Sequence, residues 1–209
     1  MSILNKIAYF QNRRDEIPNQ ELARELVQTK DIQGIREIAE NLWNKEKNIQ
    51  SDCLKVLYEI GYLDPELITD YLDDFLKLLK NRNNRLIWGG MIAIATIADI
   101  KASDIYPHRE LIQKTIEQGS VISIDNGIKI LSAIASKDEA YNQEIFPYLA
   151  HHLQTCRSQD VTRHAEYILI AVNSANKSYF ISILEKRVAD MTDTQLTRIR
   201  KLMKVLQKS

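Results

Sequence analysis

The sequence of 209 residues predicts an all-α fold in which pairs of helices stack on one another as a right-handed superhelix. The first observation is an internal repeat, because small or apolar residues recur every 37 positions at the end of the same apolar pattern: Gly61, Ala98, Ala135 and Val172. The second is that each copy holds two stretches with apolar residues three and four positions apart, separated by a polar break. One such unit cannot bury its apolar face alone, so the copies are expected to stack.

The copy from residue 64 to residue 99 shows how each element is predicted. Pro65 is placed in the first turn of its first helix, where a proline removes no hydrogen bond. A polar run at 80–84 ends this helix, and the next stretch again has helical apolar spacing. First helices are expected at about 31–43, 64–81, 104–118, 138–155 and 176–190, and second helices at about 48–61, 84–99, 121–136, 159–174 and 193–207.

We expect a single domain over residues 1–209 with about four to five helical pairs and capping helices at both ends. Four copies fill residues 31–175, and a degenerate repeat or cap follows at 176–209. Residues 1–30 are predicted to form an N-terminal cap of two short helices, at about 2–12 and 19–29. Terminal units that break the pattern are typical of repeat proteins, because a polar outer face prevents further stacking.

Two columns of the repeat predict how the helices pack. One column is apolar in every copy and is expected to be buried: Leu57, Ile94, Leu131 and Ile168. A second column lies in mid-helix and consists of Cys53, Gly90, Gly127 and His164. In the two central copies its member is a glycine. Because a glycine in a helix costs about 1 kcal/mol relative to alanine, we expect these glycines to permit close approach of a neighbouring helix.

The pattern is clearest in residues 48–61, Asn-Ile-Gln-Ser-Asp-Cys-Leu-Lys-Val-Leu-Tyr-Glu-Ile-Gly, and it resembles the second helix of a HEAT repeat. The chain is therefore similar to the HEAT-like, armadillo-type α-solenoid family, over about residues 31–175. Members of this family commonly carry Asp in the turn between the two helices and Arg early in the second helix. In this chain the turn positions hold Asn, Gln or Thr, and the positions in the second helices hold Gln, Ile or Val. The resemblance implies a scaffold whose second helices line a concave binding surface.

On the second helices, the positions beside the buried column form a ladder across the copies: Ser51 and Lys55; Arg85, Trp88 and Ile92; Asp125 and Lys129; Thr162 and Glu166. The residues expected to bind a partner are Lys55, Arg85, Trp88, Asp125, Lys129 and Glu166. An exposed tryptophan beside an arginine is typical of binding hot spots, so Trp88 is the expected anchor. The alternative, that Trp88 fills a gap against the adjacent repeat, stays open, whereas Trp43 is expected in the core.

Charge and composition favour a protein or peptide partner. The 28 basic and 28 acidic residues balance, whereas a duplex-binding protein normally presents a basic face. We therefore expect a non-enzymatic interaction module. An alternative is a nucleic-acid-binding protein similar to the HEAT-like DNA-alkylation-repair glycosylases, which the stretch 41–46 faintly resembles, although their catalytic signature has no counterpart. A repeat-type chromophore lyase is a third possibility, with a resemblance at the level of the repeats alone.

No catalytic motif, cofactor or metal is expected. His152 and Cys156 are four residues apart on one predicted helix, but a zinc site needs about four converging ligands and no second pair is evident. No segment has the length and apolarity of a membrane helix or of a signal peptide, so a cytoplasmic location is expected. Cys53 and Cys156 fall in different copies, and a disulfide between them is not expected.

Overall fold

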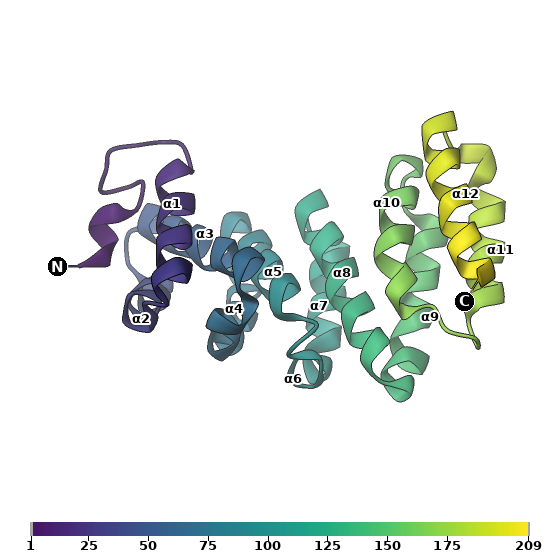
Figure 1. Cartoon of the computed structure of the whole chain (residues 1–209), viewed down its shortest axis with the longest axis horizontal. Coiled ribbons are helices and arrows are strands. Elements are labelled where there is room, and N and C mark those ends of the chain that lie inside the picture. Colours follow the sequence, from purple (N-terminus) through teal and green to yellow (C-terminus); the bar gives the residue numbers. More distant parts are fainter. Residues whose placement is uncertain (1, 209) are drawn as a thin grey trace. The chain divides into compact units, whose positions relative to one another are not determined.

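The computed structural model describes residues 2–208, and every regular element in this range is helical. Figure 1 shows the α-helices in chain order: α1 (Ile17–Thr29), α2 (Ile32–Glu40), α3 (Lys47–Leu63), α4 (Leu72–Leu78), α5 (Asn84–Ile97), α6 (Ala102–Ile105), α7 (Arg109–Gln118), α8 (Val121–Lys137), α9 (Glu139–Thr155), α10 (Ser158–Ile168), α11 (Lys177–Arg187) and α12 (Asp193–Lys208). Short 3-10 helices occupy Ile3–Lys6, Asn41–Trp43, Pro65–Tyr71, Tyr106–His108, Leu169–Ala171 and Val188–Asp190. The chain is all-α, as the sequence predicts.

The chain divides into two compact units. The first runs to Lys101 and adds Glu110–Gly127, and the second takes Ala102–Arg109 and the described residues from Ile128 onward. In the first unit, α3 packs against α1, α2 and α5, while α4 packs against α5. In the second, α9 contacts α10 and α11, and α12 contacts α10 and α11. Each unit is thus built from successive helical pairs.

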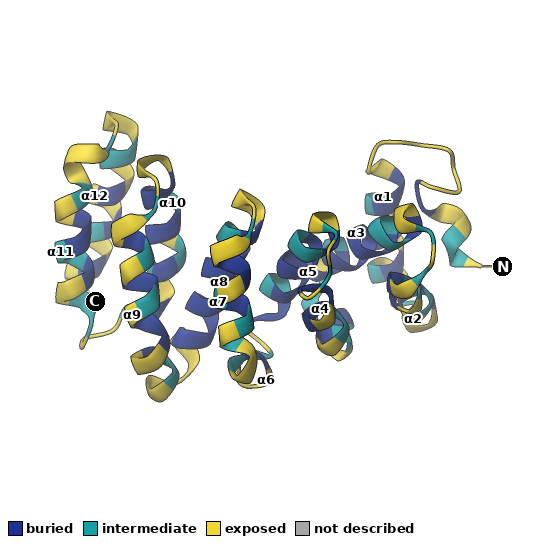
Figure 2. Ribbon diagram, turned by 180° about the vertical axis from the view of Figure 1, so that it is seen from behind, coloured by how far each residue is buried: buried dark blue, intermediate teal, exposed yellow. Residues whose placement is uncertain are grey.

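The apolar column of the repeat is buried, as predicted. Leu57 and Ile94 in the first unit are fully inaccessible to solvent, and so are Leu131 and Ile168 in the second. Figure 2 shows buried stretches (dark blue) along the helices and exposed residues (yellow) in the loop that precedes α1. The 37-residue register is therefore confirmed by burial at equivalent points of four second helices.

The glycine column has the packing role that the sequence predicts. A Cβ atom placed on Gly90 would lie 3.2 Å from Cβ of Leu78 on α4. On Gly127 it would lie only 2.3 Å from Cγ1 of Ile116 on α7. A larger side chain at either position would push the two helices of the pair apart, because the interior has little free volume.

The first helices are more interrupted than predicted. The segment expected as one helix at 64–81 begins with the 3-10 helix Pro65–Tyr71 before α4, and the segment at 104–118 consists of α6, the 3-10 helix Tyr106–His108 and α7. Both 3-10 helices contain a proline, Pro65 or Pro107. A proline supplies no N–H to an α-helical ladder, and short 3-10 pieces are common at helix ends.

The predicted helix at 2–12 is wrong. This segment forms only the 3-10 helix Ile3–Lys6, followed by turns. The backbone N–H of Ala8 donates to Oδ1 of Asn19 at 2.9 Å, and that of Tyr9 donates to Oδ2 of Asp52 at 2.8 Å. These side chains take the place of helical carbonyls as acceptors, and Asn12 adopts a positive φ of 53°. Tertiary hydrogen bonds therefore override the local apolar pattern.

Two further expectations concern Trp43 and the membrane. Trp43 is 47% exposed and its Nε1 donates to Oδ1 of Asp74 at 3.2 Å, so its predicted place in the core is wrong. The indole lies where the half-buried side chain of Asp74 on α4 offers it an acceptor. No helix among the described residues combines the length and apolarity needed to cross a lipid bilayer.

Candidate functional site

A cavity of about 610 Å³ lies in the first unit, between the segment before α1 and the second helices α3 and α5. Three of the six predicted partner-binding residues line it: Lys55, Arg85 and Trp88. Two tyrosines, Tyr9 and Tyr58, also line it, and the remaining lining is mostly polar. The structure therefore brings half of the predicted site together in one concave feature.

Helix α5 presents its two groove residues because of how it begins and how it packs. Oδ1 of Asn83 accepts a hydrogen bond from the backbone N–H of Arg85 at 3.0 Å and caps the helix, which leaves the Arg85 side chain exposed at the first turn. One turn later, Trp88 is half-buried in the cavity wall. A Cβ on Gly89 would lie 2.5 Å from Cδ2 of Leu54, so this glycine lets α3 and α5 approach closely beneath the tryptophan.

The opposite wall is held by Asp52 on α3. Its two carboxylate oxygens accept from the Tyr9 backbone N–H at 2.8 Å and from Nδ2 of Asn19 at 2.9 Å. Asn19 is itself buried and accepts from the N–H of Ala8. Asp52 and Asn19 could not be recognised as site residues from the sequence, since no pattern within one copy indicates that the N-terminal segment folds over α3. A buried asparagine at the start of a helix offers a weak signal at most.

Lys55 has a different environment from the one predicted. It is only 9% exposed, and its Nζ forms ion pairs with Glu16 and Glu59, each at 2.7 Å. The ammonium also lies 4.8 Å from the ring centre of Tyr58. Burial works to lower the pKa of Lys55, but the hydrogen bonds to Glu16 and Glu59 outweigh it and raise the pKa above its ordinary value. Lys55 is thus a charged brace in the cavity wall, and its expected part in binding a partner stays a prediction.

Two other cations at the cavity are available to a ligand. Among the described residues, no ion-pair partner contacts the exposed guanidinium of Arg14 or that of Arg85. Arg13, in contrast, is paired with Asp15 at 2.9 Å. The cavity thus combines a half-buried indole with two unpaired guanidinium groups. Guanidinium groups are suited to bidentate recognition of carboxylates.

The remaining predicted site residues do not line this cavity. Asp125 is half-buried on α8 in the first unit, and Lys129 and Glu166 belong to the second unit. Nζ of Lys129 lies 4.8 Å from the ring centre of Tyr167. Glu166 is exposed but accepts two hydrogen bonds from Arg198 on α12, at 2.5 and 2.9 Å. The expectation that all six residues form one continuous surface stays a prediction.

Two ladder positions expected at the surface are buried instead. Thr162 is 1% exposed and Ile92 is 7% exposed. Helix α12 packs against α10, and its Arg198 donates to Glu166, one turn beyond Thr162 on the same helix. The apolar Ile92 extends the core of α5 by one position. The buried face of a second helix therefore includes more positions than the single apolar column of the repeat indicates.

The architecture is that of a helical repeat protein of the armadillo and HEAT-like class, and solved structures share it. A designed armadillo repeat protein in complex with the peptide (KR)4 is 15% identical, with a TM-score of 0.70 over 98% of each chain. Computationally designed armadillo repeat proteins for modular peptide recognition are 15% identical, with a TM-score of 0.64 over 97% of each chain. An engineered protein matches all of this chain and 98% of its own, at 16% identity and a TM-score of 0.67.

At the level of sequence, neither a protein-family model nor a curated protein matches this chain. The likeness to the designed armadillo proteins therefore establishes the fold. Which ligand this chain takes has to be argued from its own residues.

Proposed function

We propose that this chain is a non-enzymatic, cytoplasmic interaction module that binds a peptide segment of a partner protein in the cavity between the N-terminal segment, α3 and α5. The observation that carries the proposal is the convergence of Trp88 and Arg85 on one cavity of about 610 Å³. Pockets of a few hundred Å³ with an aromatic surface and a few convergent polar groups are typical of ligand sites. Designed proteins of the same fold bind peptides, one of them the peptide (KR)4.

The chemistry of the cavity favours a peptide with an acidic side chain next to an apolar or aromatic one. The unpaired guanidinium groups of Arg14 and Arg85 would bind the carboxylate, and the half-buried face of Trp88 would pack on the apolar group. The acids of the wall are already engaged, Asp15 with Arg13 and Glu16 with Lys55. The free charge facing the ligand is therefore positive, although the whole chain is neutral.

The test is a selection of peptides from a random library on the full chain, followed by measurement of the affinity of a selected peptide for variants. Trp88→Ala is expected to weaken binding by at least about 30-fold, the factor that corresponds to a hot-spot loss of about 2 kcal/mol. Trp43→Ala is the matched control, because Trp43 is exposed and does not line the cavity. Arg85→Ala should weaken acidic peptides more than neutral ones.

Two results would overturn the proposal. Equal losses in the Trp88 and Trp43 variants would show that binding does not use the cavity. Binding of single- or double-stranded nucleic acid that falls steeply with salt, with no peptide selected, would favour the nucleic-acid alternative. Thermal unfolding of each variant distinguishes a local loss of contact from a loss of the fold.

A further inference from the structure

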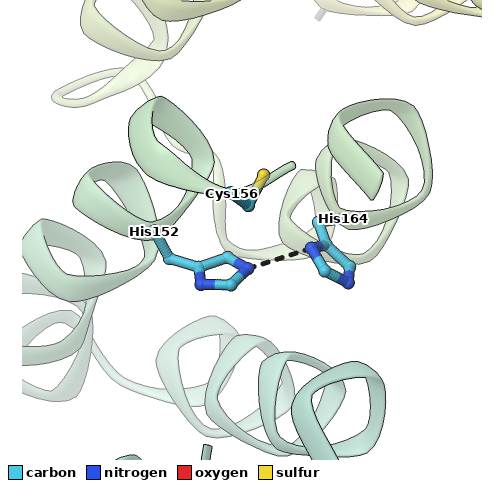
Figure 3. Close-up of side chains that lie close together, drawn as sticks. All are labelled: His152, Cys156 and His164. Atoms are coloured by element: carbon cyan, nitrogen blue, oxygen red, sulfur yellow. Dashed lines mark hydrogen bonds between the residues drawn. The ribbon is translucent and has the colours of Figure 1, made fainter. Parts of the chain in front are cut away.

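Three potential metal ligands meet in the second unit, where α9 ends and α10 begins (Figure 3). His152 lies on α9, Cys156 follows the last residue of that helix, and His164 lies on α10. One ligand atom of each side chain lies within 4.8 Å of the others, and Nε2 of His152 is 2.9 Å from Nδ1 of His164. His164 is 1% exposed, and the other two are half-buried. The two imidazoles and the thiol thus face one small volume.

Another copy of the repeat shows that this cluster is a departure from ordinary packing. The position of His164 is held by Gly90 two copies earlier, and the position of His152 by Leu78. Those two positions also face each other, because a Cβ on Gly90 would lie 3.2 Å from Cβ of Leu78. A small residue against an apolar one is sufficient to pack this helical pair. Burying an imidazole in the same place costs free energy unless its nitrogens are bound.

We propose that His152, Cys156 and His164 form a binding site for Zn²⁺. Two imidazoles and a thiolate are ligands that suit this borderline-soft ion. In a tetrahedral site the ligand atoms are about 3.3 to 3.7 Å apart. The two imidazole nitrogens, now 2.9 Å apart, therefore separate by about 0.4 Å, and the thiol sulfur, within 4.8 Å of them, approaches by at most about 1 Å. With three protein ligands, a water molecule completes the coordination, as in zinc sites with an open position.

The proton balance of the site is simple. The facing atoms, Nε2 of His152 and Nδ1 of His164, now share one hydrogen bond. When both bind the ion, the ring that donates this hydrogen bond changes tautomer: its facing nitrogen gives up its proton to solvent and its other nitrogen takes one from solvent, so that both rings stay neutral. Cys156 binds as the thiolate and releases one proton to solvent. The site then carries a net charge of plus one.

The charged group next to the site is already compensated. Arg187 donates from Nη1 to the carbonyls of Leu153 and Gln154 and from Nη2 to that of Cys156, each at 2.8 Å, and its Nε is paired with Asp190 at 2.9 Å. These bonds hold the backbone at the end of α9 and thereby position the thiol. Burial raises the pKa of Cys156, and the guanidinium of Arg187 acts in the opposite direction.

This site is independent of the proposed peptide-binding function, and it differs from the expectation from the sequence that no metal is bound. The sequence shows only one pair of ligands four residues apart, His152 and Cys156. The third ligand, His164, comes from the facing helix, and its position in the repeat is the one at which Gly90 and Gly127 indicate a packing role. The tertiary structure alone brings it to the first two.

The test uses the purified full chain after removal of metals with a chelator. Equimolar binding of Zn²⁺ is measured by competition with a chromophoric chelator, and Co²⁺ serves as a spectroscopic substitute. We expect a cobalt–thiolate charge-transfer band in the wild type and its loss in Cys156→Ser. The variants Cys156→Ser and His152→Ala should each bind Zn²⁺ more than about 100-fold more weakly, since losing even an outer-shell partner costs about 10- to 100-fold. His151→Ala is the matched control, because His151 is adjacent but exposed.

The variants replace half-buried residues and leave the buried His164 in place, so that the fold is kept; far-UV circular dichroism checks this. Zn²⁺ should raise the melting temperature of the wild type and of the His151 variant but not of the Cys156 variant. Absence of the cobalt–thiolate band in the wild type would overturn the proposal. So would equal Zn²⁺ affinity of the wild type and His152→Ala, because the two histidines would then be only a hydrogen-bonded pair.

Discussion

Gly127→Ala is expected to destabilise the protein, although alanine is the better helix former by about 1 kcal/mol. The added Cβ would lie 2.3 Å from Cγ1 and 2.6 Å from Cδ1 of Ile116, and 2.9 Å from Cε of Met91. The end of Met91 can move, but Ile116 is only 4% exposed and has no space to enter. Overpacking of this kind costs about 1 to 3 kcal/mol. The net loss of unfolding free energy should reach about 2 kcal/mol once the helix-propensity gain is subtracted.

A double-mutant cycle with Ile116→Ala tests this argument, because the effect of Gly127→Ala on stability should change sign in the variant that lacks the Ile116 side chain. Ile116→Ala removes the colliding carbons, at a cost of about 2 to 5 kcal/mol for the cavity it leaves. In that background the added Cβ meets only the movable end of Met91, so Gly127→Ala should stabilise the protein by up to about 1 kcal/mol. The coupling between the two substitutions then equals the overpacking cost, about 1 to 3 kcal/mol, within the range observed for residues in contact.

Urea denaturation followed by far-UV circular dichroism measures the four corners of the cycle. Gly90→Ala is the matched control, because its nearest contacts are 3.2 to 3.3 Å and the neighbours need to move only a few tenths of an ångström. It should therefore change the stability less than Gly127→Ala does. If Gly127→Ala has the same effect with and without Ile116, the glycine column does not serve close approach of the helices and the packing argument is refuted.

Three other substitutions or reactions follow from the burial of single side chains. Ile94→Ala, at a fully buried position of the apolar column, should lower the unfolding free energy by about 2 to 5 kcal/mol. Ile100→Ala, at a 46% exposed position, should change it by less than about 0.5 kcal/mol. Equal losses of the two variants in urea titrations would contradict the 37-residue register. Lys55→Met should lower the unfolding free energy by about 1 to 2 kcal/mol, less than the 3 to 5 kcal/mol typical of breaking a fully buried ion pair, because the side chain of its partner Glu16 is 54% exposed. A variant that is more stable than the wild type would show that this ion pair is dispensable. In native protein an alkylating reagent should modify the half-buried Cys156 but not the buried Cys53. Burial raises the pKa of Cys53 to about 12, so that the thiolate fraction of Cys53 at pH 8 is about one in ten thousand. Mass spectrometry of the modified peptides measures the order of reaction, and faster modification of Cys53 would contradict the prediction.

The sequence alone determines the all-α fold, the helical pairs and the buried column of this protein. Leu57 and Ile168 lie at equivalent buried points because the same apolar spacing recurs in each copy. Amphipathic periodicity and repetition are local and additive signals, so each copy supports the assignment of the others. The packing role of Gly90 and Gly127 could also be predicted, since a glycine in mid-helix requires a compensating contact.

The N-terminal cap and the lining of the cavity depend on tertiary structure. The segment before α1 lacks the repeat register, and its course is set by hydrogen bonds from Ala8 and Tyr9 to Asn19 and Asp52. The placement of Trp88 and Arg85 on one helix could be predicted from the sequence, and both line the cavity. The paired state of Lys55 could not, because its partner Glu16 lies 39 positions away in sequence, in a segment outside the repeats.

The histidine and cysteine cluster shows the same limit at a single site. The sequence places His152 and Cys156 on one helix face, because the spacing of four residues is a property of the helix itself. Whether His164 meets them depends on how closely α9 and α10 pack and on the rotamers that this packing permits. Periodicity determines which residues share a helix face, but only the approach of neighbouring helices determines which side chains from different faces share one site.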